Sequence, residues 1–258
     1  MNAYVKKFID YRFLLLELVK KGIRLKYRRS YLGILWSMVE PLLTMIVLTI
    51  VFGNLLGAHE KTFPVYILTG RLLYDFYSKG TRGALNSIRK NSAMIKKVYV
   101  PKYLYPLSEV IFNFIIFAIS LIVLAAVSLV LGVYPTAKIL WVFVPILLLL
   151  VLTLGCGMLL VTLSVFFRDV EYLWNIFLML IMYTCAIFYY PDNILQTGFA
   201  WILNLNPLYC VISLFRSCMF GTAFDMYQLY YAAGFSLCTL LLGFFFFYKK
   251  QDEFILHL

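Results

Sequence analysis

The sequence predicts an all-α integral membrane protein with six transmembrane helices, an amphipathic helix before the first and re-entrant outer helices before the last. Three observations predict this fold class. Of the 258 residues, 63% are hydrophobic and 14% are charged, whereas about half the residues of a soluble domain are apolar. The apolar residues form runs of about 20, the length that crosses a hydrocarbon core about 30 Å thick. Lys and Arg outnumber Asp and Glu by 23 to 12 and gather between those runs, as in cytoplasmic loops.

An amphipathic interface helix is expected within residues 1–31. Between Val5 and Arg28, charged side chains recur every three or four residues, and apolar side chains occupy the opposite face. Such a helix lies in the headgroup plane of a membrane, although packing on another protein face fits the pattern as well. The same stretch lacks the short apolar core and small-residue cleavage site of a signal peptide.

Five apolar stretches are plain membrane spans. Glu40 is the single charge in the first stretch and Glu109 the single charge in the next, and the other three carry none. The five stretches cover residues 32–56, 104–131, 139–167, 172–190 and 229–248.

A sixth span, residues 65–85, is less obvious because it contains Arg71, Asp75, Lys79 and Arg82. Steps of four, four and three residues place these charges on one stripe of a helix, where the first three can pair in sequence. A span with one polar stripe faces a protein interior or a watery path. We therefore expect residues 65–85 to cross the membrane inside a bundle.

The distribution of basic residues supports this number of spans. Nine Lys and Arg precede Leu32, five lie between residues 89 and 102, and Lys249 and Lys250 follow the last span. Loops rich in Lys and Arg stay cytoplasmic. Six spans put all three clusters on that side, whereas five would leave 89–102 outside. We expect a multi-pass protein of the cytoplasmic (inner) membrane with both termini cytoplasmic.

Residues 199–220 are expected to form two short helices that dip into the outer leaflet. Asn206 and Pro207 interrupt an apolar stretch whose halves are each too short to cross. Non-helical backbone at that depth must be buried in protein or line a cavity. Two helices lying flat on the outer surface remain an alternative.

Four blocks of the sequence resemble the permease subunits of type-two ABC exporters that move polysaccharides and teichoic acids. In chain order they are LKYRRSYLGILWSMVEPLL (25–43), MIKKVYVPKYLYPLSE (94–109), FFRDV (166–170) and NPLY (206–209). The resemblance covers nearly the whole chain. It implies a homodimer, driven by two copies of a separate ABC ATPase, that carries a lipid-linked glycan of the O-antigen, capsule, rhamnan or teichoic acid type to the outer leaflet.

ATP and Mg²⁺ are expected on the partner ATPase, and no cofactor is expected in this chain. The sequence contains no G-x-x-x-x-G-K-[ST] loop and no Gly-Lys dipeptide, so the usual phosphate cradle must lie on another polypeptide. The chain is therefore expected to be a transport subunit and not an enzyme.

Residues 89–102 are expected to contact the ATPase. The segment is cytoplasmic and basic, and Asn91 and Ser92 can cap a short helix that Pro101 would stop. The resemblance implies that this is a coupling helix, with a second contact after the fourth span. A solvated basic loop attracted to anionic lipid is the alternative. The candidate coupling residues are Asn91, Met94, Ile95, Lys96, Lys97, Val98, Tyr99, Arg168 and Asp169.

Three further groups of residues are candidates for handling the substrate. Glu40 lies about 9 Å into the first span, where it should face the bundle, a pore or a cation such as Arg71 or Lys79. Aromatic rings within spans can slide along sugar C–H groups, although each ring singly fits core packing better. The path candidates are Glu40, Arg71, Asp75, Lys79, Tyr66, Tyr74, Tyr77 and Tyr183, the diphosphate or headgroup candidates are Lys26, Arg28 and Arg29, and the outer-gate candidates are Asn206, Pro207 and Arg216.

Other functional classes have less support. The basic residues flank spans and form no single patch with interleaved aromatics, so nucleic acid is not an expected partner. Two His and five dispersed Cys provide few ligands for a metal site. An ion-coupled secondary transporter remains an alternative, although the sequence shows no obvious inverted repeat. A membrane glycosyl- or acyltransferase is a further alternative, although the sequence has no DxD, H-E-x-x-H or G-x-S-x-G arrangement. No feature distinguishes among the glycans.

Overall fold

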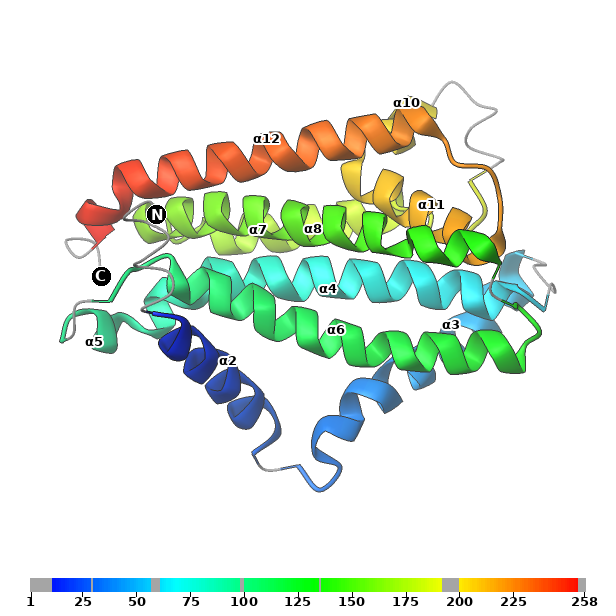
Figure 1. Cartoon of the computed structure of the whole chain (residues 1–258), viewed down its shortest axis with the longest axis horizontal. Coiled ribbons are helices and arrows are strands. Elements are labelled where there is room, and N and C mark those ends of the chain that lie inside the picture. Colours follow the sequence, from blue (N-terminus) through cyan, green and yellow to red (C-terminus); the bar gives the residue numbers. More distant parts are fainter. Residues whose placement is uncertain are drawn as a thin grey trace.

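The computed structural model describes residues 11–28, 30–56, 61–97, 100–134, 136–191 and 200–254, without the side chains of residues 54–56. Long helices lie side by side along one axis, with the short helix α5 at one end of the bundle and α10 and α11 at the other (Figure 1). No strand occurs in these described ranges, which agrees with the predicted all-α class. Helices satisfy their own backbone hydrogen bonds, as a lipid environment requires.

The described helices follow the apolar runs of the sequence. In chain order they are α2 (Arg12–Tyr27), η1 (Gly33–Leu35), α3 (Trp36–Leu56), α4 (Phe63–Lys90), α5 (Ser92–Ile95), α6 (Leu104–Val130), η2 (Ala137–Val142), α7 (Phe143–Phe166), α8 (Val170–Thr184), α10 (Ala200–Asn204), α11 (Pro207–Phe220), α12 (Met226–Lys250) and η3 (Gln251–Glu253).

Four helical segments within the described ranges are long and apolar enough to cross a membrane. They coincide with the first, third, fourth and last predicted spans. They cover Gly33–Gly53, Leu104–Val130, Ala137–Phe166 and Met226–Glu253.

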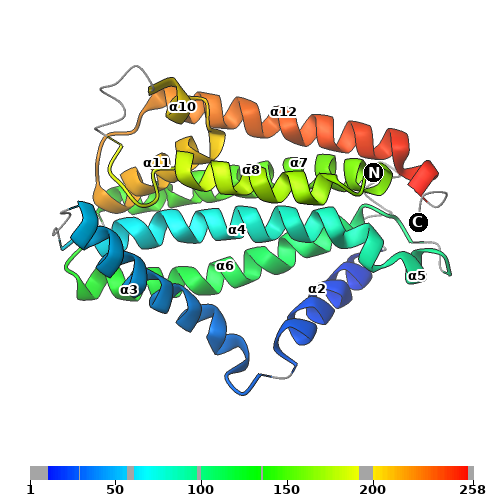
Figure 2. The ribbon, with the colours of Figure 1, turned by 180° about the vertical axis from the view of Figure 1, so that it is seen from behind.

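Helix α4, which carries the charged stripe, lies in the middle of the bundle (Figure 2). Its 28 residues correspond to a length of about 42 Å. It packs against α3, α6, α7, α8 and α11, and residues such as Ile67, Leu73 and Ile88 are fully buried. This position explains how a helix with four charges along one stripe can belong to an apolar bundle, because other helices cover most of its surface.

Helix α8 ends earlier than the sequence predicted. The apolar run continues to Tyr190, but the helix stops at Thr184, and the turn that follows is buried at Cys185, Ala186 and Ile187. Ala186 has a φ of 47°, in the left-handed region that ends helices. The expected helical span to residue 190 is wrong in its last part, because hydropathy does not report where a helix stops.

The break predicted at Asn206 and Pro207 is confirmed. The Asn206 side chain caps α11 by accepting hydrogen bonds from the N–H groups of Leu208 and Tyr209, and Pro207 occupies the first turn, where a missing N–H is harmless. Gly221, with a φ of 73°, ends the helix. Helix α11 then packs against α12, η2, α7 and α4.

Glycine allows the closest helix contact of the bundle, between α7 and α12. An added Cβ at Gly155 would lie 2.5 Å from the Leu240 nitrogen, and one at Gly243 would lie 2.6 Å from the Gly155 oxygen. Real side chains cannot occupy such positions, so the two backbones touch. Small residues at helix crossings are typical of membrane proteins.

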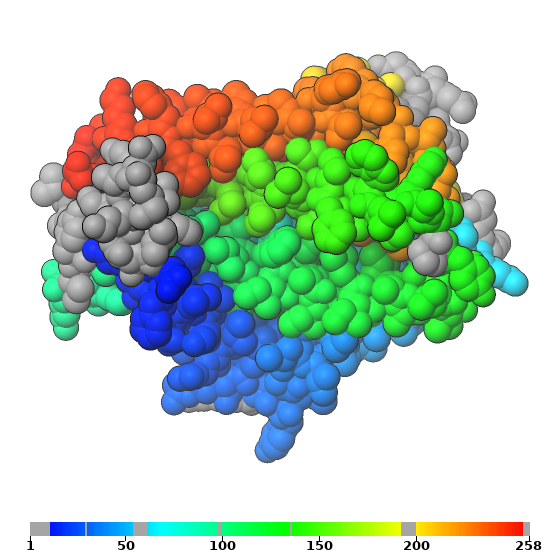
Figure 3. All heavy atoms as spheres, in the orientation of Figure 1, coloured from blue at the N-terminus to red at the C-terminus, as the bar shows by residue number. Residues whose placement is uncertain are grey.

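Helices α2 and α3 form a V on one side of the bundle (Figure 1), and the residues between them project from that side in the space-filling view (Figure 3). Helix α2 packs against α6 and lies within the stretch predicted to be amphipathic. Tyr31, in the projecting loop, is fully exposed. The V therefore presents a loop with Arg28 at a distance from the helix bundle.

Candidate functional site

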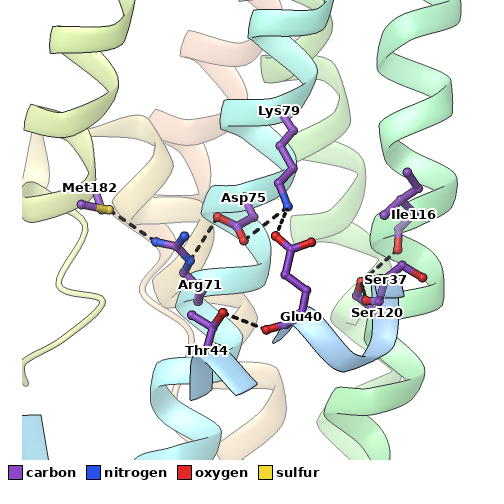
Figure 4. Close-up of polar contacts among 9 residues, drawn as sticks. All are labelled: Ser37, Glu40, Thr44, Arg71, Asp75, Lys79, Ile116, Ser120 and Met182. Atoms are coloured by element: carbon purple, nitrogen blue, oxygen red, sulfur yellow. Dashed lines mark hydrogen bonds and ion pairs between the residues drawn. The ribbon is translucent and has the colours of Figure 1, made fainter. Parts of the chain in front are cut away.

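The charged stripe of α4 forms a ladder of ion pairs, as its spacing predicted (Figure 4). Arg71 Nε lies 3.1 Å from Asp75 Oδ1, and Lys79 Nζ lies 3.8 Å from Asp75 Oδ2. Lys79 Nζ also lies 2.9 Å from Glu40 Oε1 on α3. Arg71 further donates to the sulfur of Met182 on α8. The ladder thus joins three helices and contains equal numbers of positive and negative charges.

Glu40 has the cationic partner that its place within a span requires, and that partner is Lys79. Pro41 has no N–H to donate to the Ser37 carbonyl one turn earlier. The Ser120 hydroxyl of α6 donates to that carbonyl at 2.9 Å instead. Helix α3 is therefore joined to α4 by an ion pair and to α6 by a hydrogen bond at the same level.

The crevice between α3, α4 and α6 beside this ladder is narrow. Its volume is about 30 Å³, and Ser37, Glu40, Asp75, Lys79 and Asn113 contribute its polar lining. This volume holds a single water molecule. A sugar does not fit this crevice, so the ladder joins the helices here, while the half-exposed side chains of Glu40 and Lys79 also reach the surface of the chain.

Three of the four tyrosines predicted to line a path are buried in the core. Tyr74 donates its hydroxyl to the Leu178 carbonyl, the Tyr77 and Trp174 ring centres lie 6.2 Å apart, and Tyr66 lies near the start of α4 with 7% exposure. Tyr183 differs, because its side chain is exposed on α8. Tyr66, Tyr74 and Tyr77 are therefore buried in this conformation, and the path assignment of all four tyrosines stays a prediction.

The short helix α5 turns its apolar side inward. Ile95 is buried in a core cluster of its own chain, and Met94 packs against that cluster. Lys96 and Lys97 are exposed. The surface offered by this segment is therefore basic, and its apolar side chains stabilise its own chain.

Two predicted features of this segment differ from the structure or lie outside it. The Asn91 side chain makes no capping hydrogen bond to α5, so that expectation is wrong, and its Nδ2 donates to the Ser87 carbonyl at the end of α4 instead. Val98 and Tyr99 lie outside the described residues. Arg168 and Asp169 are exposed in the turn between α7 and α8.

A polar contact that the sequence did not predict joins the ends of α4 and α8. Glu171 Oε2 lies 2.6 Å from Arg89 Nη2, and Asn86 donates to Glu171 Oε1 at 3.0 Å. Hydrogen bonds from Asn86 and then Arg89 lower the pKa of the Glu171 carboxyl, although partial burial opposes them. The two segments proposed to meet a partner are therefore linked within the chain.

The headgroup candidates occupy the arms and apex of the V. Lys26 is exposed at the end of α2, with its Nζ 5.5 Å from the Tyr27 ring centre and 5.8 Å from that of Phe112 on α6. Arg28 is exposed in the projecting loop, and Arg29 lies outside the described residues. Exposed cations at one level are suitable for phosphate.

Arg216 of α11 is buried and bonded to main-chain oxygens. Its Nη1 donates to the Ala186 carbonyl at 2.9 Å and its Nη2 to the Tyr66 carbonyl at 3.0 Å, and the guanidinium lies 3.4 Å from the centre of the Tyr66 ring. No ion pair of this side chain occurs in the part of the chain that the structure describes. Arg216 therefore joins the turn after α8, through the Ala186 carbonyl, to α4, through the Tyr66 carbonyl.

Arg216 Nε also donates to Thr69 Oγ1 at 3.4 Å. Asn206 and Tyr66 complete this arrangement, and we call the five residues Tyr66, Thr69, Ala186, Asn206 and Arg216 the outer clamp. Asn206 Nδ2 donates to Thr184 Oγ1 at 2.9 Å. The Tyr66 hydroxyl lies 3.0 Å from the Ala186 oxygen and 2.9 Å from the Tyr189 oxygen. Two of the three outer-gate candidates, Asn206 and Arg216, thus contact the end of α8, and Arg216 also contacts α4. Tyr66 has a role there that sequence reasoning missed, because its partners are about 120 residues away in the chain.

Comparison with known proteins identifies the family. A model of the ABC-2 type transporter family matches residues 14–220. The O-antigen export system permease protein RfbA of Klebsiella pneumoniae is 28% identical over 250 residues, which cover 95% of this chain and 96% of that protein. The polysialic acid transport protein KpsM of Escherichia coli is 23% identical over 86% of this chain and 88% of its own length.

A third relative has a related name. The capsule polysaccharide export inner-membrane protein CtrC of Neisseria meningitidis is 21% identical over 94% of this chain and 92% of its own length. The similarity thus extends over nearly the whole helical bundle, and the family match alone includes every described element from α2 to α11. The chain belongs to the ABC-2 type transporter family.

Proposed function

We propose that this chain is the membrane-spanning permease subunit of an ATP-driven exporter that moves a lipid-linked polysaccharide across the cytoplasmic membrane. The O-antigen, capsule, rhamnan and teichoic acid types of glycan are the candidates. The observation that carries the proposal is similarity over nearly the full length of relatives named for O-antigen and capsule export.

Six crossings and cytoplasmic termini are part of this proposal. Helices α4 and α8 would add to the four apolar segments, with α4 shielded by the helices around it. The end of the bundle with α5 and the basic Lys249 and Lys250 would be cytoplasmic, because Lys and Arg mark that side. Helices α10 and α11, at the opposite end, would dip into the outer leaflet as re-entrant helices.

The surface of the single chain supports a homodimer. Helix α3 exposes Leu43, Ile46, Val47 and Ile50, and α8 exposes a comparable row that ends at Tyr183. A second copy can cover part of these faces, and the rest would border a path between the subunits. Because the crevice at the ion ladder holds only a water molecule, passage of a glycan would run along such a shared surface.

Two copies of an ABC ATPase would supply ATP and Mg²⁺ to the assembly. Their contact on this chain would be the basic surface of Lys96 and Lys97 together with the turn at Arg168 and Asp169. The link between Arg89 and Glu171 supports this assignment, since it allows a push on one segment to reach the other.

The substrate would be received and released at opposite ends. Lys26 and Arg28 would attract the diphosphate or headgroup of the lipid carrier at the cytoplasmic side, as cationic side chains suit phosphate. The outer clamp would form the gate on the other side. Neither role requires chemistry from this chain, which would supply the route while the partner supplies energy.

Co-purification with the ABC ATPase that the neighbouring gene encodes tests the proposal. The tagged chain and its ATPase are expressed together, reconstituted in vesicles, and compared with a complex whose ATPase lacks its P-loop Lys. We expect a stable complex whose ATP hydrolysis needs both subunits and whose glycan export in cells stops with the ATPase variant. Export that continues without ATP hydrolysis and collapses with a proton uncoupler would instead establish an ion-coupled transporter.

A further inference from the structure

The turn that follows α12 is docked against the bundle. Phe254 has no exposed surface, although Asp252 and Glu253 directly precede it. Its ring packs edge-on against Phe247 with centres 5.3 Å apart, and against Phe166 with centres 6.0 Å apart. A fully buried aromatic side chain beyond the last apolar run indicates a fixed position for this turn, because exposing it would return its apolar surface to water.

One side of the turn meets the end of α7. Phe166 is the last residue of that helix, two positions before Arg168. Lys250 Nζ lies 5.8 Å from the Phe166 ring centre and is held there by Glu253, whose Oε1 is 2.8 Å away. Movement of the turn would therefore move the loop that carries Arg168.

The other side of the turn meets the end of the segment that contains α5. Lys102 donates a hydrogen bond from Nζ to the Gln251 carbonyl, and the same nitrogen lies 6.0 Å from the Phe254 ring centre. Val100 and Ile95 belong to the same buried cluster as Phe254. A single turn therefore contacts both cytoplasmic segments that stand next to the exposed Lys96 and Arg168.

These contacts lie apart from the pair formed by Arg89 and Glu171. The two segments are thus tied twice, once through the start of α8 and once through the turn after α12. Two ties restrict rotation of one segment against the other, which a single ion pair between partly exposed side chains cannot do.

We infer that residues 251–254 are a positioning element for the partner-binding surface. Phe254, and the hydrogen bond from Lys102 to Gln251, hold the α5 segment and the loop at Arg168 at a fixed separation. A partner that pushes on either segment then displaces both together. The inference rests on the proposed function, because it assumes that an ATPase binds these two segments.

Spin-label distances in the reconstituted complex test the inference. Labels are placed at Ala93→Cys and Phe167→Cys, which are exposed, after exposed Cys238 is replaced by Ser. We expect one narrow distance distribution with and without nucleotide. Phe254→Ala should broaden it and reduce permease-dependent ATP hydrolysis about five-fold, which is within the range by which packed residues change coupling between sites.

Matched variants separate positioning from stability. Phe246→Ala removes the same ring from a half-exposed position on α12 and should leave distance and hydrolysis unchanged. Phe254→Leu should restore both, and Lys102→Met should broaden the distribution while the subunits still co-purify. If Phe254→Ala does not fold, Lys102→Met provides the test.

Failure of the positioning role and failure of the proposed function give different results. An unchanged distance distribution and unchanged hydrolysis in folded Phe254→Ala or Lys102→Met would overturn the positioning role while leaving the proposed function intact. A wild-type chain that never stimulates the ATPase would overturn the proposed function itself.

Discussion

Position 70 of α4 is expected to require glycine because the guanidinium of Arg216 packs against it. A Cβ at position 70 would lie 2.6 Å from Arg216 Nη2, which is closer than non-bonded atoms approach. The guanidinium must then move, and the hydrogen bond from Nη2 to the Tyr66 carbonyl at 3.0 Å is the contact most directly affected. The variant Gly70→Ala therefore tests the outer clamp without removing any of its polar groups.

The magnitude follows from two opposed effects. A hydrogen bond that involves a charged group contributes about 1.5–3 kcal/mol, and its loss destabilises the variant. Replacing Gly by Ala inside a helix stabilises it by about 1 kcal/mol. The net loss should be about 0.5–2 kcal/mol, which corresponds to a fall of roughly 1–8 °C in the midpoint of thermal unfolding for a chain of this size.

Thermal unfolding of the purified protein in detergent measures this effect. Gly234→Ala is the matched control, because that glycine is also inside a helix and has no heavy atom within 4 Å of the added Cβ. The control should be neutral or slightly stabilised. Repeating both changes in an Arg216→Met background should make Gly70→Ala harmless. Equal effects of Gly70→Ala with and without the Arg216 side chain would refute the reasoning.

Three other predictions concern charged side chains. Lys79→Met should destabilise the protein by less than about 3 kcal/mol because Glu40, whose side chain is about half exposed on the surface of α3, loses its cation within a predicted span, and adding Glu40→Gln should restore much of the loss in the same unfolding assay. Since hydrogen bonds lower the folded-state pKa of Glu171, its stabilising effect is complete above the ordinary Glu pKa and is lost as the pH falls through the lowered one. The difference in unfolding midpoint between wild type and Glu171→Gln should therefore disappear on acidification, whereas a constant difference would contradict this. Lys96→Glu with Lys97→Glu should slow association with the ATPase and reverse its salt dependence in a binding-rate measurement, as rim charges do, and an unchanged association rate would exclude this surface.

The spacing of residues within one helix was enough to predict the ion ladder. It did not predict how far one helix is shifted along its axis relative to another. Arg71, Asp75 and Lys79 lie on one helix, so steps of four residues determine their pairing. The choice of Lys79 over Arg71 as the partner of Glu40 depends on how α3 is placed against α4, and no pattern within either segment contains that information.

The end of α8 and the burial of Arg216 could not be predicted from the sequence for a related reason. Residues 185–190 are as apolar as the helix before them, so hydropathy continues past the point where hydrogen bonding stops. The burial of Arg216, an outer-gate candidate, was not predicted because its acceptors, on Ala186 and Tyr66, are 30 and 150 positions away. Main-chain carbonyls have no sequence signature, so a charged side chain that binds them is expected from the sequence to be solvent-exposed.

The two ends of the bundle are built on different physical principles. At the end with α10 and α11, a turn inside the apolar region leaves carbonyls that only protein groups can satisfy, so Arg216 and Tyr66 are fixed by the cost of unpaired oxygens. At the end with α5, water can satisfy any carbonyl, and order comes from the buried rings of Phe254, Phe166 and Phe247. A change of one polar bond therefore alters the outer clamp sharply, whereas the cytoplasmic surface yields gradually as packing is lost. Under the proposed function, this difference would suit a gate that opens only when its bonds are exchanged and an ATPase-binding end that follows a moving partner.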